Sequence, residues 1–101
     1  MSDSTLDRRD VLPQLFPDPD QYLMVSGLAG AARDACALTD EGDNLLHLGG
    51  AMGAAVSLGL GVALSAPESQ VAVITGDGEL LMNVGALTTV ASMMPDNLTI
   101  V

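Results

Sequence analysis

The chain has 101 residues, which suffices for one small domain, and hydrophobic residues make up 49% of it. Thirteen acidic residues face three basic ones, so the net charge is −10. This balance argues against nucleic acid and anionic membranes as partners, because both attract Lys and Arg. Cys36 is the single cysteine and the acidic N-terminus lacks a signal-peptide core, so we expect a cytoplasmic protein.

The N-terminal part of the chain alternates between helical and extended patterns. Residues 4–16 predict a short helix that Pro17 ends. Residues 21–26 predict a buried strand, and residues 30–39 predict a helix after a glycine turn. A polar cluster at residues 39–44 indicates a surface loop.

Residues 45–67 carry no charge, and a run of this length could span a bilayer. However, Gly49-Gly50 would break such a helix near its start, and no basic residues flank the run. The run divides more naturally into a strand at 45–48, a glycine-rich turn at 49–53 and a helix at 54–65. That helix is apolar on every side, so we expect it to be buried on all faces.

The C-terminal third begins with an apolar, β-branched segment at residues 71–75, which is typical of a central parallel strand. Gly76-Asp77-Gly78 follows, and then Leu80, Val84, Leu87, Ala91 and Met94 recur at steps of three and four. This spacing predicts one face of a single helix, followed by a further strand at 98–101. The alternation predicts an α/β fold, with a parallel sheet and helices on both faces.

We interpret residues 1–20 as an N-terminal helix and linker and residues 21–101 as one domain. Because the chain ends within the last expected strand, we expect the C-terminal part of this domain to be missing.

Three junctions between a strand and a turn are rich in glycine: Ser26-Gly27, Gly49 to Gly53, and Gly76 to Gly78. In a parallel sheet all three should lie at the carboxyl edge, where ligands bind. Asp77 stands between two glycines and offers a hard oxygen ligand of the kind that suits Mg²⁺, and the amides at Gly78, Glu79 and Leu80 could meet phosphate. The alternative is that Asp77 only caps the following helix.

The segment VAVITGDGELLMNVGALTTVASMMPDNLTIV resembles the thiamine-diphosphate motif of 2-oxo-acid decarboxylases and acetolactate-synthase-like enzymes. The preceding LHLGGAMGAAVSLGLGVALSAPESQ resembles the same domain. The resemblance is closest to phosphonopyruvate and sulfopyruvate decarboxylases, the latter through their beta subunit, in which a GSMG turn and a GDGxLLMN motif occur in this order. It implies a thiamine-diphosphate-binding fold over about residues 21–101.

The resemblance assigns roles to individual positions. It implies that Asp77 binds Mg²⁺, that the Gly50 carbonyl accepts a hydrogen bond from the cofactor's aminopyrimidine, and that Met52 props the cofactor in a bent form. It implies that the backbone of Gly78 and Glu79 contacts the diphosphate, although the Glu79 carboxylate should repel it unless the side chain points away. The implied cofactor-binding positions are Gly27, Leu28, Ala29, Gly50, Ala51, Met52, Gly76, Asp77, Gly78 and Glu79.

The family's activating glutamate and its second side-chain metal ligand, an asparagine, have no counterpart here, and the catalytic residues remain unknown. The resemblance therefore implies a pyrimidine-binding domain or subunit as partner, an oligomer, and a small 2-oxo acid as substrate. We predict a thiamine-diphosphate- and Mg²⁺-binding part of a decarboxylase. The alternatives are a non-catalytic nucleotide-binding α/β module and an inactive truncated fragment.

Several side chains have simpler interpretations. We expect His47 to be a core or hydrogen-bonded histidine, and Cys36 to serve in packing. Asn83 suits either a helix cap or a cleft. The methionines at 82, 93 and 94 are expected in the core or at an interface.

Overall fold

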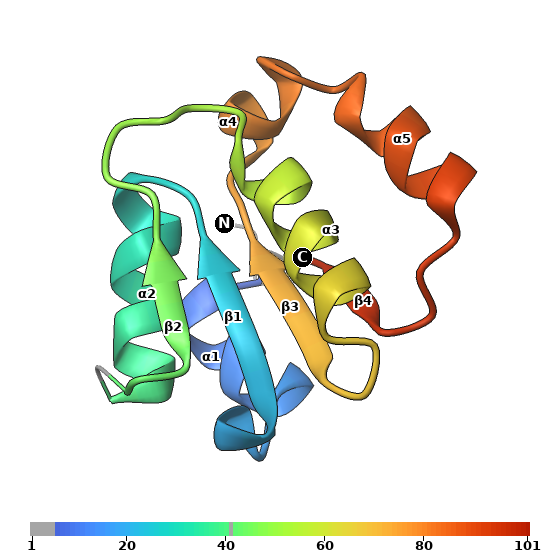
Figure 1. The fold of residues 1–101 in the computed structure, drawn as a ribbon. Helices are drawn as coiled ribbons and strands as arrows, with labels where there is room; N and C mark the ends of the chain where they lie inside the picture. Colours follow the sequence, from blue (N-terminus) through green and yellow to red (C-terminus); the bar gives the residue numbers. More distant parts are fainter. Residues whose placement is uncertain (1–5, 41) are drawn as a thin grey trace.

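The computed structural model describes residues 6–40 and 42–101 as a parallel four-stranded sheet with helices on both faces (Figure 1). This arrangement confirms the predicted α/β class. The strands are β1 Tyr22–Ser26, β2 Leu45–His47, β3 Gln70–Ile74 and β4 Leu98–Ile100. The helices are α1 Arg8–Leu15, α2 Ala29–Thr39, α3 Ala55–Ser65, α4 Asp77–Leu81 and α5 Ala86–Met93.

The strand order is β2-β1-β3-β4, so the chain adds β2 on one side of β1 and then returns to place β3 on the other side. Helices α1 and α2 cover one face of the sheet, while α3 covers the other (Figure 1). The order of the strands therefore reverses between β1 and β3, and in an open α/β sheet such a reversal opens a crevice at the carboxyl ends of the strands.

Strand β3 is the central strand that its apolar sequence predicts, since it pairs with both β1 and β4 and is buried from Val71 to Ile74. Alternate side chains serve opposite faces. Ala72 and Ile74 join Leu12 and Phe16 in the core on the α1 and α2 face, while Val73 joins Val56 in the core beneath α3. A strand with helices on both faces needs apolar residues at every position, which explains the absence of alternation in its sequence.

Helix α3 is not buried on all faces, so that expectation was wrong. Its inner side packs closely on the sheet, and at Gly59 an added Cβ would overlap the side chain of Val73. Its outer side, which includes Ser57, Gly61 and Leu64, is exposed because no other described element covers it. The helix has 11 residues, and no helix among the described residues is long and apolar enough to cross a membrane.

The single helix predicted after the Gly-Asp-Gly turn is instead two helices, α4 and α5, separated at residues 82–85. At the break, the amide of Asn83 donates to the carbonyl of Leu80 at 3.1 Å, which is a tighter turn than an α-helix makes. The break shifts the helical phase, so Ala86 and Val90 face the core beneath α3. Val84 and Met94, which were expected on the packed face, are exposed, and so are the methionines at 82 and 93.

The N-terminal helix is shorter than predicted. Among the described residues it begins after Asp7, whose carboxylate accepts a hydrogen bond from the amide of Arg9 at 2.9 Å as an N-cap. In this part of the chain Leu12 is buried, whereas Leu6 and Leu15 are exposed. Residues 4 and 5 of the predicted helix lie outside the described residues.

Candidate functional site

The three glycine-rich junctions meet at the carboxyl edge of the sheet, as their sequence predicts. The amide of Gly27, directly after β1, donates to the carbonyl of Ile74 at the end of β3 at 2.9 Å. The amide of Leu48, directly after β2, donates to the carbonyl of Ser26 at 3.0 Å. The turns that follow β1 and β3 therefore stand side by side where the strand order reverses, and the turn after β2 lies next to them.

Asp77 is the first residue of α4, and its side chain is exposed at this edge. Gly76 occupies the N-cap position, and Asp77 follows it within the first turn of the helix. One carboxylate oxygen of Asp77 accepts from the amide of Gly78 at 2.8 Å. A carboxylate in this position can still offer its other oxygen to a cation.

Some backbone groups next to Asp77 already form hydrogen bonds within α4. The amide of Leu80 donates to the carbonyl of Gly76 at 2.9 Å, so the expectation that this amide could meet phosphate was wrong. The reason is that Leu80 already lies four residues into the helix, where the regular backbone hydrogen bond forms.

The Glu79 side chain is buried between the start of α4 and the turn after β1. Only 7% of Glu79 is exposed, and one carboxylate oxygen accepts from the amide of Leu28 at 3.1 Å. The same oxygen lies 3.4 Å from the hydroxyl of Thr75. The carboxylate therefore lies against the turn after β1, next to the amide of Leu28.

The turn at residues 49–53 carries an exposed Met52, half of whose surface is accessible. The turn ends at Gly53, whose φ of +88° is a conformation that residues with a side chain rarely adopt. The side-chain amide of Asn83 donates to the carbonyl of Gly53 at 3.0 Å. Asn83 thus ties this turn to the break between α4 and α5, a role that its position in the sequence did not reveal.

Four glycines leave open space at this edge. A Cβ added at any of them would meet no atom within 4 Å, and these residues are Gly49, Gly50, Gly76 and Gly78. A ligand can therefore approach the backbone of both turns closely. The described residues bring together no group of three His, Cys, Asp or Glu side chains, and Asp77 is the exposed carboxylate of the turn at residues 76–78. This donor set suits Mg²⁺ shared with phosphate and water, and it fits a diphosphate cofactor.

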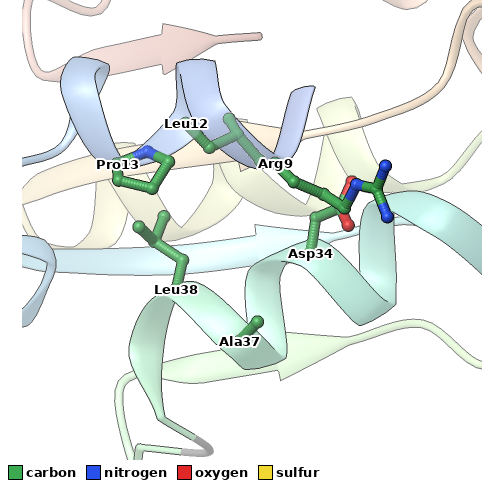
Figure 2. A pocket seen from close by; sticks show the side chains of 6 residues that line it. All are labelled: Arg9, Leu12, Pro13, Asp34, Ala37 and Leu38. Atoms are coloured by element: carbon green, nitrogen blue, oxygen red, sulfur yellow. The ribbon is translucent and has the colours of Figure 1, made fainter. Parts of the chain in front are cut away.

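Two other regions lack these features. A cavity of about 110 Å³ lies between α1 and α2 and is lined by Arg9, Leu12, Pro13, Asp34, Ala37 and Leu38 (Figure 2). Its one carboxylate, Asp34, is buried and forms an ion pair with Arg8. His47 lines a separate pocket together with Cys36 and is exposed, so of the two expectations, a core or a hydrogen-bonded histidine, the first was wrong. The cause is the position of β2 at the edge of the sheet.

Residues 19–101 match the family described as thiamine pyrophosphate enzyme, C-terminal TPP binding domain. The beta subunit of sulfopyruvate decarboxylase from Methanothermobacter thermautotrophicus is 38% identical over 95% of this chain and 51% of its own length. The corresponding subunit from Methanocaldococcus jannaschii is 39% identical over 93% and 50%. Phosphonopyruvate decarboxylase from Streptomyces hygroscopicus is 40% identical over 96% of this chain and 24% of its own length.

The chain therefore spans about half the length of the sulfopyruvate decarboxylase subunits and about a quarter of the phosphonopyruvate decarboxylase. The match to the family model covers most of the chain and includes every turn of the site described above. From this match and from the parallel α/β fold, we conclude that the chain belongs to the thiamine pyrophosphate enzymes, within their C-terminal thiamine-pyrophosphate-binding domain.

Proposed function

We propose that this chain binds thiamine diphosphate through Mg²⁺, with Asp77 as the side chain that holds the metal. The observation that carries the proposal is the meeting of three glycine-rich turns at the reversal of strand order, with Asp77 exposed between them. Mg²⁺ held by a single carboxylate shares its remaining positions with phosphate oxygens and water. The open space over Gly76 and Gly78 supports the approach of a diphosphate to that carboxylate.

The pyrimidine end of the cofactor would lie over the turn at residues 49–53. There the carbonyl of Gly50 would accept a hydrogen bond from the aminopyrimidine, and the exposed Met52, next to Ala51, would support the bent cofactor. The turn at Gly27, Leu28 and Ala29 would stand on the diphosphate side. The adjacency of these turns to Asp77 supports the assignment, which rests on the family resemblance at each position.

The reaction that we propose is the decarboxylation of a small 2-oxo acid, with sulfopyruvate and phosphonopyruvate as the candidate substrates. The names of the relatives support this class. When bound, the cofactor supplies a thiazolium ring that accepts the electron pair left by departing carbon dioxide. The contribution of this chain is to grip the diphosphate and orient the cofactor, and we assign no catalytic residue within it.

We further propose that a pyrimidine-binding domain or subunit packs against α4 and α5 in an oligomeric enzyme. Residues 80–95 contain no charged residue, although the whole chain carries a net charge of −10. Exposed apolar surface of this kind marks interaction sites. The large exposed apolar side chains of this segment are Leu81, Met82, Val84, Leu87, Met93 and Met94.

The single cysteine supports a reducing, cytoplasmic location.

Calorimetry on the purified chain tests the proposal. Thiamine diphosphate should bind only when Mg²⁺ is present, and Asp77→Ala should weaken binding about tenfold or more, since the metal loses its protein ligand. Asp96→Ala, which removes an exposed acid remote from the turns, is the matched control and should bind normally. If the chain bound a mononucleotide or dinucleotide but not thiamine diphosphate, the alternative of a nucleotide-binding module would be correct. If it bound neither, the alternative of an inactive fragment would be correct.

A further inference from the structure

Glu79 is a buried carboxylate without a cationic partner. It is 7% exposed, and neither of the ion pairs among the described residues involves it. Its second oxygen, Oε1, is buried and has no hydrogen-bond partner within the described residues. Burying a carboxylate in this way is unfavourable, so its retention in a small core calls for a compensating role.

The contacts of Glu79 join two turns that are far apart in the sequence. Its Oε2 accepts from the amide of Leu28, 51 positions away, at 3.1 Å. The room for this contact comes from the missing side chain at Gly27, since a Cβ there would overlap the Glu79 carboxylate. Glu79 thus connects the turn after β1 to the first turn of α4, which begins at Asp77.

The turn after β1 needs such an anchor. Leu28 is the N-cap residue of α2, but it provides no side-chain hydrogen bond to the helix. The next residue, Ala29, has a φ of +53°, which is a left-handed conformation that is unfavourable for a residue other than glycine. Such a conformation persists only where the surrounding structure holds it.

We propose that Glu79 is a positioning residue that holds the turn at residues 27–29 against the start of α4 and so sets the width of the crevice at the reversal of strand order. This inference rests on the proposed function, because the crevice is the proposed diphosphate site. The Glu79 carboxylate acts by accepting the hydrogen bond from the Leu28 amide, and it does not contact the ligand. The carboxylate is needed as a hydrogen-bond acceptor, and its charge is not.

Two substitutions at this position separate these properties. Glu79→Gln keeps an acceptor oxygen for the Leu28 amide, whereas Glu79→Ala removes it. In the 101-residue chain, Glu79→Ala should speed hydrogen exchange of the Leu28 amide about tenfold and weaken Mg²⁺-dependent binding of thiamine diphosphate by a similar factor. Glu79→Gln should stay within about threefold of the unsubstituted chain in both measurements. If Glu79→Gln were as defective as Glu79→Ala, the positioning role would be overturned.

Gly27→Ala provides a second test that leaves Glu79 chemically intact. The added methyl group should displace the carboxylate and reproduce the tenfold loss in the unsubstituted background. In a Glu79→Ala background the same change has room, so it should alter hydrogen exchange of the Leu28 amide by less than about twofold. Losses that simply added in the double variant would overturn the proposal.

The two hypotheses fail in different ways. If the unsubstituted chain did not bind thiamine diphosphate, the proposed function would be wrong. The exchange rate of the Leu28 amide would still decide the positioning role, because it requires no ligand. Unchanged exchange in Glu79→Ala would overturn that role even if the chain bound the cofactor normally.

Discussion

The side-chain amide of Asn83 donates a hydrogen bond to the carbonyl of Gly53 at 3.0 Å, and this contact joins the helix break after α4 to the turn that precedes α3. The approach is close, since a Cβ added at Gly53 would lie 3.0 Å from the Cβ of Asn83. The turn that carries Met52 is therefore held in place by the segment that follows Asp77.

Removing this contact should loosen the turn at residues 49–53. We expect Asn83→Ala to lower the free energy of unfolding by about 0.5–1.5 kcal/mol, the typical net value of one hydrogen bond. Asn83→Asp should be more harmful, because it replaces the donor by a carboxylate that faces a carbonyl oxygen. Urea denaturation measures both, with the exposed Thr89→Ala as a neutral control. A neutral Asn83→Asp variant would show that the contact does not stabilise the protein.

Met52 should matter for the cofactor and little for the fold. Half of its surface is exposed, so we expect Met52→Ala to change the free energy of unfolding by less than about 0.5 kcal/mol. Turnover of the complete enzyme should fall, because the cofactor would lose its support. Leu15→Ala removes an equally exposed side chain, 50%, at the end of α1 and should leave turnover unchanged. Normal turnover in Met52→Ala would show that Met52 does not support the cofactor.

The stability of the first turn of α1 should fall at acidic pH, because Asp7 caps this turn as a carboxylate. Hydrogen bonds from the side chain and the backbone of Arg9 lower the pKa of this carboxyl from its ordinary value of 3.8 to about 2. Because the folded pKa lies below the unfolded one, the carboxylate stabilises the helix above about pH 4 and loses this contribution as pH falls through about 2.

An NMR titration of the Asp7 carboxyl measures this shift directly. Asp7→Asn provides the matched control, since asparagine also caps helices but does not titrate. In that variant the amide shifts of Arg9 should not follow the acid transition. A midpoint near 3.8 in the unsubstituted chain would contradict the predicted coupling between Asp7 and Arg9.

The isolated chain should be catalytically silent. It offers the diphosphate side of the proposed site, and its resemblance assigns the activating glutamate to another domain. We expect no carbon dioxide from sulfopyruvate, phosphonopyruvate or pyruvate when the purified chain is assayed with thiamine diphosphate and Mg²⁺. Turnover by the chain alone would mean that it contains a base of its own. The exposed His47 would be the first to test by substitution with Gln.

Local pattern determined most of the secondary structure. The apolar run that forms β3 has no alternation, and only a strand covered on both faces suits it. The glycines after each strand marked the turns, so Asp77 could be predicted as a metal ligand from the sequence, whereas the role predicted for Met52 came from the family resemblance. The prediction of a single helix after Asp77 was wrong, because it took the regular spacing of apolar residues from Leu80 to Met94 as evidence of an unbroken helix. The turn at Asn83 interrupts it and changes which side faces the core.

The order of the strands and the direction of Glu79 were decided only by the tertiary structure. Local periodicity determines whether a residue is in a strand or a helix, but it carries no information about which strand lies beside which. The turns after β1 and β3 stand side by side because β3 pairs with β1 on the side opposite to β2. Glu79 is buried because the amide of Leu28 and the space left by Gly27 meet it between these two turns. A contact between residues 51 positions apart forms only once the sheet has assembled, so no sequence window of helical or strand length contains it.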